Sequence, residues 1–205
     1  MKVGLLFDLD GTLLDTLGDL RNSVNVALAQ FGYPQRTLAE IRSFVGTGAR
    51  NLSRLSMPEG KDNVDEVLAA FQAHYKDHCN IETGPYAGIP AALEALKDVP
   101  MAIVSNKPDY AVKELAAIYF PGIYALGEVA GIPRKPAPDM LFKAMADIGV
   151  ETCIYIGDSE VDVQTARNAG LPLVAVNWGF RTTQQLVDAG AELIVSTTED
   201  LLAAL

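Results

Sequence analysis

The sequence predicts an α/β fold: a Rossmann-like parallel sheet with helices on both faces, plus a small all-helical cap inserted after the first strand. Three observations lead to this expectation. Short apolar runs alternate with segments of helical spacing along most of the chain. The runs are continuous rather than alternating with polar residues, which indicates strands buried on both sides. One long stretch, residues 17–82, breaks this rhythm and contains no convincing strand.

Four apolar runs are the expected core strands. They span residues 3–7, 101–104, 153–156 and 173–176. Apolar residues recur at helical spacing over residues 108–118, 138–148 and 161–169. Parallel strands need such crossover helices, because the chain must return to the same edge of the sheet before the next strand begins. The order of strands and helices therefore predicts a sheet covered on both faces.

The stretch that lacks strands is expected to form a separate helical cap. Helical patterns occur near residues 19–31, 37–44, 47–55 and 64–79. Thr37 and Glu40 have the spacing of a capping box, in which two side chains bond the free backbone N–H groups at a helix start. A segment rich in Gly and Pro then marks the linker back to the core. The predicted domains are a core over 1–16 and 83–205 and a cap over 17–82.

The composition narrows the class of partner. The 205 residues carry a net charge of −10, without a block of Lys and Arg. We expect no nucleic-acid partner, because such a chain would approach phosphates against its own field. The apolar runs are too short to cross a bilayer, so no membrane partner is expected either. The residues after Met1 do not have the form of a signal peptide.

The two cysteines, Cys79 and Cys153, are far apart in the sequence. They form neither a disulfide framework nor the spacing of a zinc site, and we interpret them as packing residues. A reducing, cytoplasmic location is therefore the expectation. The sequence leaves open whether the protein is a monomer or a homodimer.

Polar side chains gather where the predicted strands end. In an open parallel sheet, ligands bind outside the carboxyl ends of the strands, so clusters far apart in sequence are expected to meet there. Taken singly, each cluster also fits a structural role, such as a helix cap or a solvated loop. Their common position at strand ends favours a shared site. The clusters are Asp8 with Asp10, Ser105 to Lys107, Lys135, and Asp158 with Asp162.

Three of the acids have the character of a magnesium site. Asp8 and Asp10 are two residues apart and can lie at different depths around one cation, and Asp158 adds a third carboxylate. Oxygen ligands suit Mg²⁺, whereas zinc is disfavoured because the cluster contains no His or Cys. A bound cation would lower the repulsion between an anionic substrate and the carboxylate of Asp8, and would keep that carboxylate ionised as a nucleophile.

The remaining polar residues are suited to hold a phosphoryl group. Lys135, Ser105 and Asn106 offer one charged and two neutral side chains to its oxygens. Gly11 and Thr12 follow the first acids, where backbone N–H groups can approach an anion closely. We therefore expect a small organic phosphate as the substrate.

Four segments of the chain resemble the motifs of the haloacid dehalogenase superfamily, and together they extend over essentially the whole sequence. Within that superfamily the sequence is most similar to the phosphoglycolate phosphatase group, because of its helical insert and the loop from Asn177 to Arg181. The segments are Asp8-Leu-Asp-Gly-Thr-Leu-Leu-Asp-Thr16, Ser105-Asn-Lys, Arg134-Lys-Pro-Ala-Pro-Asp139 and Gly157-Asp-Ser-Glu-Val-Asp162.

The resemblance implies a magnesium-dependent phosphatase, with 2-phosphoglycolate as the first candidate substrate. Asp8 would attack phosphorus and form an aspartyl phosphate, and Asp10 would protonate the leaving oxygen and then activate water. Ser105 would donate a hydrogen bond to the phosphoryl group, and Lys135 would neutralise the charges of Asp8 and the phosphate. Asp158 would ligate magnesium together with Asp8 and the backbone carbonyl of Asp10. Asp162 would orient Lys135 or a metal-bound water.

The cap is expected to select the substrate. Gly46 and Gly48 precede a predicted helix and can form an anion-binding turn, and Arg50 can pair with a carboxylate through two hydrogen bonds. A helix connection with a surface arginine is an equally good interpretation of this segment. The other arginines of the cap compete for the same role: Arg21, Arg42 and Arg54.

Other functions stay open at this point. A β-phosphoglucomutase-like phosphomutase would use the same acid pair but return the phosphoryl group to a bound sugar. Phosphatases for pyrophosphate, a nucleotide or a sugar phosphate would share the whole site. A phosphonate hydrolase would need a cap lysine, and neither Lys61 nor Lys76 lies in the segment from Gly46 to Arg50. A phosphoacceptor domain without turnover would not need Asp10.

Overall fold

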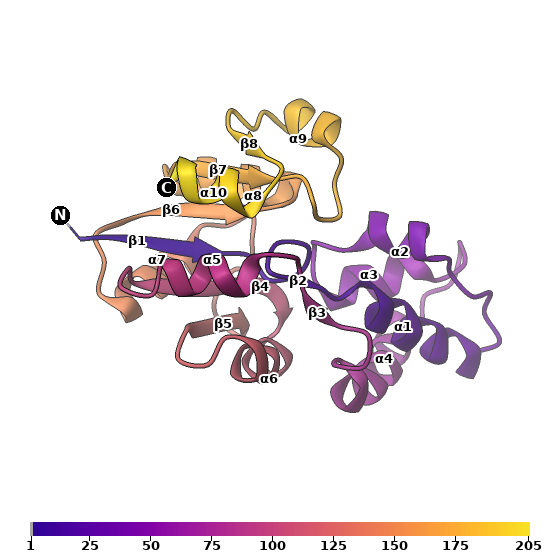
Figure 1. Cartoon of the computed structure of the whole chain (residues 1–205). Helices are drawn as coiled ribbons and strands as arrows, with labels where there is room; N and C mark the ends of the chain where they lie inside the picture. The colour runs from indigo at the N-terminus through magenta and orange to yellow at the C-terminus, as the bar shows by residue number, and fades with distance from the viewer. Residues whose placement is uncertain (1) are drawn as a thin grey trace. The chain divides into compact units, whose positions relative to one another are not determined.

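The structure is a computed structural model that describes residues 2–205. The chain divides into two compact units (Figure 1). One unit, the core, comprises the segment up to Asp15 together with Pro85–Leu205, and the other, the cap, comprises Thr16–Gly84. No helix in the described part of the chain has the length and apolar composition that a membrane crossing requires.

The core contains a six-stranded sheet in which every neighbouring pair is parallel. The predicted α/β fold class is confirmed. The strands lie in the order β5-β4-β1-β6-β7-β8. Their bounds are β1 (Val3–Phe7), β4 (Met101–Pro108), β5 (Tyr124–Glu128), β6 (Thr152–Gly157), β7 (Leu173–Val176) and β8 (Ile194–Val195).

The strand order reverses beside β1. From β1 the chain passes to β4 and β5 on one side, and then crosses to β6, β7 and β8 on the other. Figure 1 shows β1 between β6 above it and β4 below it. A reversal of strand order of this kind opens a crevice at the carboxyl ends of the strands, because the flanking connections leave in opposite directions. Side chains that follow β1, β4 and β6 therefore converge.

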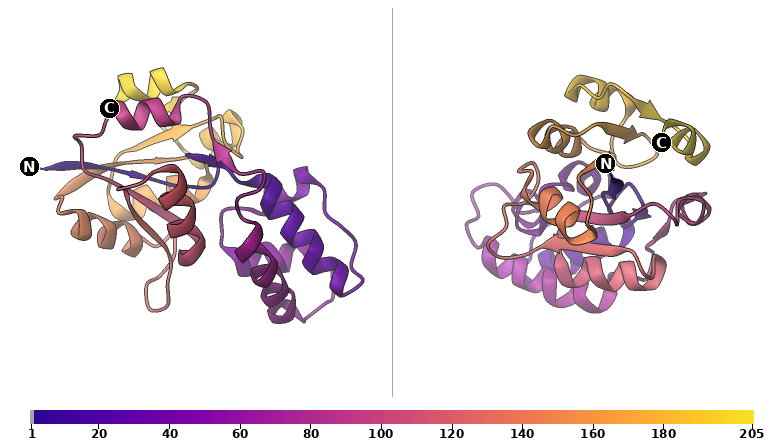
Figure 2. Two further views of the ribbon diagram at one scale, coloured as in Figure 1. Left: turned by 60° about the horizontal axis from the view of Figure 1, so that its bottom comes forward. Right: turned by 90° about the vertical axis from the view of Figure 1, so that its left-hand side faces the viewer.

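Helices cover both faces of this sheet. Leu6 on β1 and Tyr155 on β6 are fully buried in an apolar cluster with α7 and α8. Leu5 and Phe7 are buried on the opposite face, since side chains alternate along a strand. Figure 2 (left) shows α10, in yellow, beside α5, in magenta. The helices are α5 (Ile89–Ala95), α6 (Asp109–Tyr119), α7 (Asp139–Ile148), α8 (Glu160–Ala169), α9 (Thr183–Ala189) and α10 (Thr198–Ala204).

Several short elements of the core were not predicted. The strands β5 and β8 lie at the two edges of the sheet, and β5 contains a Gly and ends in a Glu, so its apolar pattern is weak. The helices α5, α9 and α10 have seven residues each, which is too few for a clear helical period. Two further strands, β2 (Leu14–Asp15) and β3 (Gly84–Pro85), pair with each other where the chain leaves and re-enters the core.

The cap consists of four helices, as the sequence predicts. The capping box of Thr37 and Glu40 is present at the start of α2. Helix α3 begins two residues later than expected, because Gly48, with φ +90°, is its N-cap residue. The bounds are α1 (Leu17–Gln30), α2 (Leu38–Phe44), α3 (Ala49–Ser56) and α4 (Val64–His78).

A buried carboxylate ties the two ends of the cap together. Asp19, near the start of α1, is fully buried and accepts hydrogen bonds from the backbone N–H groups of Ile81, Glu82 and Thr83 at 2.9–3.1 Å. The Thr83 hydroxyl donates a further bond of 2.7 Å. These donors replace the water that the carboxylate loses on burial, so the charge of Asp19 stays well solvated inside the protein.

Candidate active site

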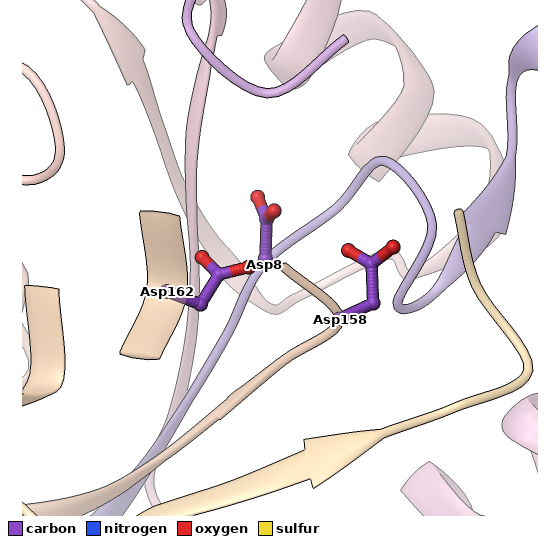
Figure 3. Close-up of side chains that lie close together, drawn as sticks. All are labelled: Asp8, Asp158 and Asp162. Carbon is purple, nitrogen blue, oxygen red and sulfur yellow. The ribbon is translucent and has the colours of Figure 1, made fainter. Parts of the chain in front are cut away.

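Three carboxylates gather at the carboxyl ends of β1 and β6. Asp8 follows β1, Asp158 follows β6, and Asp162 lies in the first turn of α8. Each offers an oxygen that lies within 4.8 Å of the others, and all three residues are buried (Figure 3). The sequence predicts the convergence of Asp8 and Asp158, and the structure brings them together.

Lys135 lies between two of these acids. Its Nζ is 2.9 Å from Oδ1 of Asp8 and 2.9 Å from Oδ1 of Asp162. Only 1% of the lysine side chain is exposed. Lys135 also donates to the hydroxyl of Tyr155 at 2.8 Å. A buried ammonium needs such a complete set of acceptors, because each unpaired N–H group would carry the full cost of desolvation.

Asp162 is occupied by protein donors. The Tyr155 hydroxyl donates to its Oδ1 at 2.6 Å, and the hydroxyl and backbone N–H of Ser159 donate to its Oδ2 at 2.6 and 3.1 Å. Ser159 and Asp162 form the capping box of α8, which fixes the acid in place. With Lys135 added, both oxygens of Asp162 have partners, so its surroundings favour an orienting role over direct metal ligation.

Asp158 is held by the loop that follows β7. The backbone N–H of Phe180 donates to Oδ2 of Asp158 at 2.7 Å, and the Thr12 hydroxyl lies 3.4 Å from Oδ1. The approach of the neighbouring backbone is close: a Cβ atom on Gly179 would lie 2.4 Å from Asp158 Oδ2 and 2.2 Å from the carbonyl oxygen of Gly11. Glycine is therefore required at position 179 for the loop to reach the acid.

Asp10 lies apart from the three-acid cluster and pairs with a different lysine. Nζ of Lys107 is 2.8 Å from Oδ1 of Asp10. The sequence groups the Asp10 side chain with Asp8 and Asp158 around one cation, whereas the carboxylates that meet are Asp8, Asp158 and Asp162. The reason is that the chain turns sharply after β1, where Gly11 N–H bonds the carbonyl of Leu14. Ligation through the backbone carbonyl of Asp10 stays a prediction.

Ser105 and Asn106 lie near the end of β4 and are buried. The amide nitrogen of Asn106 donates to the backbone carbonyl of Lys135 at 2.9 Å, and the Ser105 hydroxyl accepts from the backbone N–H of Lys107 at 3.3 Å. Asn106 thus joins the β4 segment to the Lys135 segment. Their contact with a phosphoryl group stays a prediction.

Burial raises the proton affinity of Asp8 and Asp158. For Asp8, desolvation is the largest effect; together with the charges of Asp162 and Asp10 it raises the pKa from 3.8 to about 7, although Lys135 opposes the shift. Desolvation and the charges of Asp162 and Asp8 raise the pKa of Asp158 well above its usual range. A cation bound between these acids would favour their ionised forms.

Lys135 and Asp162 shift in the directions expected of an ion pair. Burial alone would lower the pKa of Lys135, but the carboxylates of Asp162 and Asp8 outweigh it, and the pKa is raised. Burial alone would raise the pKa of Asp162, but Lys135 and the hydrogen bonds from Ser159 and Tyr155 lower it. Both groups therefore stay charged at neutral pH.

The acid cluster fits magnesium better than zinc. All of its donors are carboxylate oxygens, and the cluster contains no His or Cys. Magnesium prefers oxygen ligands and keeps several waters, so two protein carboxylates are sufficient. Asp8 and Asp158 would be these ligands, since both oxygens of Asp162 already accept hydrogen bonds, from Lys135 and Tyr155 on Oδ1 and from Ser159 on Oδ2.

The two cap residues of the predicted site, Gly46 and Arg50, belong to the second unit. Gly46 has φ +122° and precedes α3, and Arg50 lies in the first turn of that helix. The guanidinium of Arg50 forms a salt bridge with Asp65 of α4, and half of the arginine side chain is exposed. Their substrate contacts stay predictions.

Three contacts in the site were not part of the sequence-based prediction: those of Lys107, Tyr155 and Phe180. Lys107 is the third residue of a recognised motif, but nothing in the sequence shows that it faces Asp10. Tyr155 lies within an apolar strand, where a tyrosine is an ordinary core residue. Phe180 contributes only a backbone N–H group, which no side-chain pattern can reveal. The two aromatic residues beside a glycine mark the loop around Phe180 in the sequence, but they do not reveal its contact with Asp158.

Taken together, a buried acid cluster and an ion-paired lysine at the carboxyl ends of a parallel sheet are typical of an enzyme site of the hydrolase class. The chain belongs to the haloacid dehalogenase-like hydrolases, whose family pattern matches residues 5–176. The family resemblance and the enzyme class predicted from the sequence are confirmed.

The similarity to named relatives covers most of the chain. Phosphoglycolate phosphatase of Rhodobacter capsulatus is 38% identical over 196 residues, which cover 89% of this chain and 88% of the relative. Phosphoglycolate phosphatase 1 of Pseudomonas aeruginosa is 32% identical over 212 residues, covering 97% and 78%. A crystal structure of a candidate phosphoglycolate phosphatase from Lactobacillus delbrueckii has a TM-score of 0.92 at 40% identity and covers 100% of this chain and 98% of its own.

Proposed function

We propose that this protein is a magnesium-dependent phosphatase that hydrolyses a small organic phosphate monoester, with 2-phosphoglycolate as the best candidate, through an aspartyl phosphate on Asp8. The observation that carries the proposal is the buried carboxylate of Asp8, 2.9 Å from the Lys135 ammonium and next to the Asp158 carboxylate. An acid buried beside a fixed cation is poised to meet a phosphoryl group, because the lysine offsets the charge that both bring.

In the first step, an oxygen of Asp8 attacks phosphorus and the bond from phosphorus to the ester oxygen breaks. Asp10 gives its proton to that leaving oxygen, so the alcohol departs neutral. Lys135, the Ser105 hydroxyl, the Asn106 amide and the backbone around Gly11 and Thr12 hold the equatorial oxygens of the phosphoryl group.

In the second step, Asp10 takes a proton from water, and the water oxygen attacks the phosphorus of the aspartyl phosphate. Inorganic phosphate leaves and Asp8 is regenerated as a carboxylate. One residue acts as acid and then as base, because the proton that it gives up in the first step is replaced in the second.

Asp8, Asp158 and the backbone carbonyl of Asp10 would hold the magnesium ion. When bound, Mg²⁺ neutralises part of the phosphate charge and keeps Asp8 ionised. This matters because burial raises the pKa of Asp8 to about 7 in the absence of the metal.

The preference for 2-phosphoglycolate is supported by the names of the relatives and by the cap. Two curated relatives with 38% and 32% identity are named phosphoglycolate phosphatases. Gly46 and Arg50 would bind the substrate carboxylate, for which a guanidinium is well shaped. The salt bridge of Arg50 with Asp65 would have to exchange for the substrate.

A phosphate-release screen tests the proposal. The panel contains 2-phosphoglycolate, pyrophosphate, a nucleoside monophosphate, a sugar phosphate and β-glucose 1-phosphate, each with Mg²⁺ and with a chelator. We expect magnesium-dependent phosphate release, highest for 2-phosphoglycolate and absent in Asp8→Asn. Asp147→Asn, at an exposed acid of α7, is the matched control and should behave as the unaltered protein.

Other outcomes of the screen would redirect or end the proposal. Isomerisation of β-glucose 1-phosphate without free phosphate would favour a phosphomutase. A different best ester would keep the phosphatase and remove the substrate assignment. No phosphate release from any ester would contradict the function itself.

A further inference from the structure

Lys107 is a buried lysine for which the proposed mechanism has no use. Only 2% of its side chain is exposed, and its Nζ lies 2.8 Å from Oδ1 of Asp10, whose own side chain is 12% exposed. Asp8 already has its own cation in Lys135. The core therefore provides two lysines for the two acids that follow β1, one for each.

The end of β4 is shaped to deliver this lysine. The register between β4 and β5 shifts between Val104 and Pro108, so the strand is irregular where Lys107 lies. Such irregularities turn a side chain away from the direction that a regular strand would give it. The strand also stays beside β1, where Ile103 is paired with Phe7, so the segment after Ile103 lies next to the segment after Phe7.

A close backbone contact holds the irregular segment in place. A Cβ atom on Gly127 of β5 would lie 2.8 Å from the carbonyl oxygen of Lys107 and 2.4 Å from Cα of Asp109. The N–H of Gly127 donates to the Asp109 carboxylate at 2.9 Å. The backbone that carries Lys107 is thus packed directly against β5, which leaves it little freedom to move.

A purely structural explanation fits this pair poorly. A buried ion pair is a weak source of stability, because the loss of hydration offsets most of the attraction, and apolar residues of the same volume often serve as well. What a buried ammonium does supply is a fixed position for its carboxylate, since separating two buried opposite charges is costly.

We propose that Lys107 is a positioning residue that holds the Asp10 carboxylate where it can transfer a proton to the leaving oxygen. This inference rests on the proposed phosphatase function and extends it. Lys107 acts through Asp10 and not on the phosphoryl group. Its loss should therefore matter most for esters whose leaving oxygen must be protonated, and least for esters whose leaving group departs as a stable anion.

Comparison of two esters tests this role. The ratio kcat/KM reports the steps up to departure of the leaving group, so it isolates the first step. For Lys107→Met we expect kcat/KM to fall at least about tenfold on 2-phosphoglycolate, as for an impaired general acid. On 4-nitrophenyl phosphate the fall should stay under about threefold, because nitrophenolate needs no proton. Lys113→Met, at an exposed lysine of α6, should leave both values unchanged.

A double variant separates action through Asp10 from an independent effect. If Lys107 works through Asp10, Asp10→Asn combined with Lys107→Met should be no worse than Asp10→Asn alone, within about twofold. Lys107→Arg keeps the charge and should recover part of the activity on 2-phosphoglycolate. Gly127→Ala keeps the lysine side chain but pushes on the backbone that carries it, so it should show the same ester selectivity. This variant replaces Lys107→Met if the latter does not fold.

The contrary outcomes are distinct. Equal losses on both esters, or losses that multiply in the double variant, would overturn the positioning role while the phosphatase function stands. If the unaltered protein releases phosphate from neither ester, the proposed function fails, and the role of Lys107 in it fails as well.

Discussion

The ammonium of Lys135 lies 2.9 Å from the carboxylate of Asp8, although the two residues come from opposite halves of the chain. The lysine also holds Asp162 at 2.9 Å, so a single buried cation compensates two buried acids. Removing it would leave two carboxylates without a counter-charge.

We therefore expect Lys135→Met to destabilise the metal-free protein by about 3 kcal/mol at pH 8, which is typical when one partner of a buried pair is removed. Urea denaturation measures the loss. Lys97→Met is the control, because Lys97 forms an exposed pair with Glu94, and this change should not be detectable. A loss as small as that of the control would show that the Lys135 pair does not support the core.

The raised pKa of Asp8 makes magnesium binding dependent on pH. The pKa lies at about 7 in the metal-free protein, mainly because of burial, and the metal binds the ionised form. Below about pH 7 a proton must therefore leave Asp8 before the ion can bind, so the affinity should rise between pH 6 and 8.

Calorimetry in two buffers with different heats of ionisation checks this expectation. The binding heat should depend on the buffer more strongly at pH 6 than at pH 8, because Asp8 releases more protons on binding at the lower pH. Buffer-independent heats at both values would mean that Asp8 is already ionised in the free protein.

The hydroxyl of Tyr155 bridges the lysine and the second acid. It accepts from Lys135 at 2.8 Å and donates to Asp162 at 2.6 Å. Tyr155→Phe should lower the free energy of unfolding by about 1–2 kcal/mol, because the two hydrogen bonds of the hydroxyl are lost. It should also lower kcat by the same factor on every ester, because it disturbs Lys135 and not the proton transfer to the leaving group. Tyr124→Phe is the matched control, since Tyr124 bonds an exposed carboxylate, Asp147, on the surface. An unchanged kcat in Tyr155→Phe would contradict the bridge.

The loop after β7 is expected to be indispensable for metal binding. A methyl group at Gly179 would collide with the Gly11 carbonyl and with Asp158. Gly179→Ala should therefore weaken magnesium binding at least about tenfold, as second-layer changes at metal sites do. Gly84→Ala is a suitable control, because an added methyl there meets no atom within 4 Å. Equal magnesium affinity in both variants would show that the loop does not set the position of Asp158.

Within the cap, the carboxylate of Asp19 is expected to hold the return linker. Asn offers one acceptor and places an NH₂ group against backbone donors, so Asp19→Asn should lose about 2 kcal/mol and speed amide exchange at Glu82 and Thr83. Hydrogen exchange resolves this residue by residue, and Asp65→Asn, at an exposed acid of α4, is the control. Unchanged protection at Glu82 and Thr83 would mean that the linker is held by other contacts.

The long-range architecture was predictable because the strands of a parallel sheet carry a strong local signal. The buried runs around Leu6 and Ile156 are continuous and apolar, and they end at acids, so both the strands and the edge at which the acids meet follow from the sequence. The four family motifs added the pairing of Asp8 with Lys135. Edge strands and seven-residue helices were missed because their patterns are too short to exceed chance.

The finer geometry of the site could not be predicted. The separation of Asp10 from the acid cluster depends on the turn after β1, and the contact of Lys107 with Asp10 depends on the irregular register of β4. Both are tertiary effects, which no spacing along the chain encodes. The N–H of Phe180 on Asp158 is likewise a backbone contact from a distant loop.

The central claim is that Asp8 carries the phosphoryl group during turnover, and chemical trapping tests it most directly. The protein is mixed with 2-phosphoglycolate and Mg²⁺, quenched in acid within the first turnover, reduced with borohydride and digested, so that an acyl phosphate is converted to homoserine. Peptide mass spectrometry should then find homoserine at position 8, only when substrate is present. Phosphate release with Asp8 unmodified, or homoserine at Asp10 instead, would contradict the account.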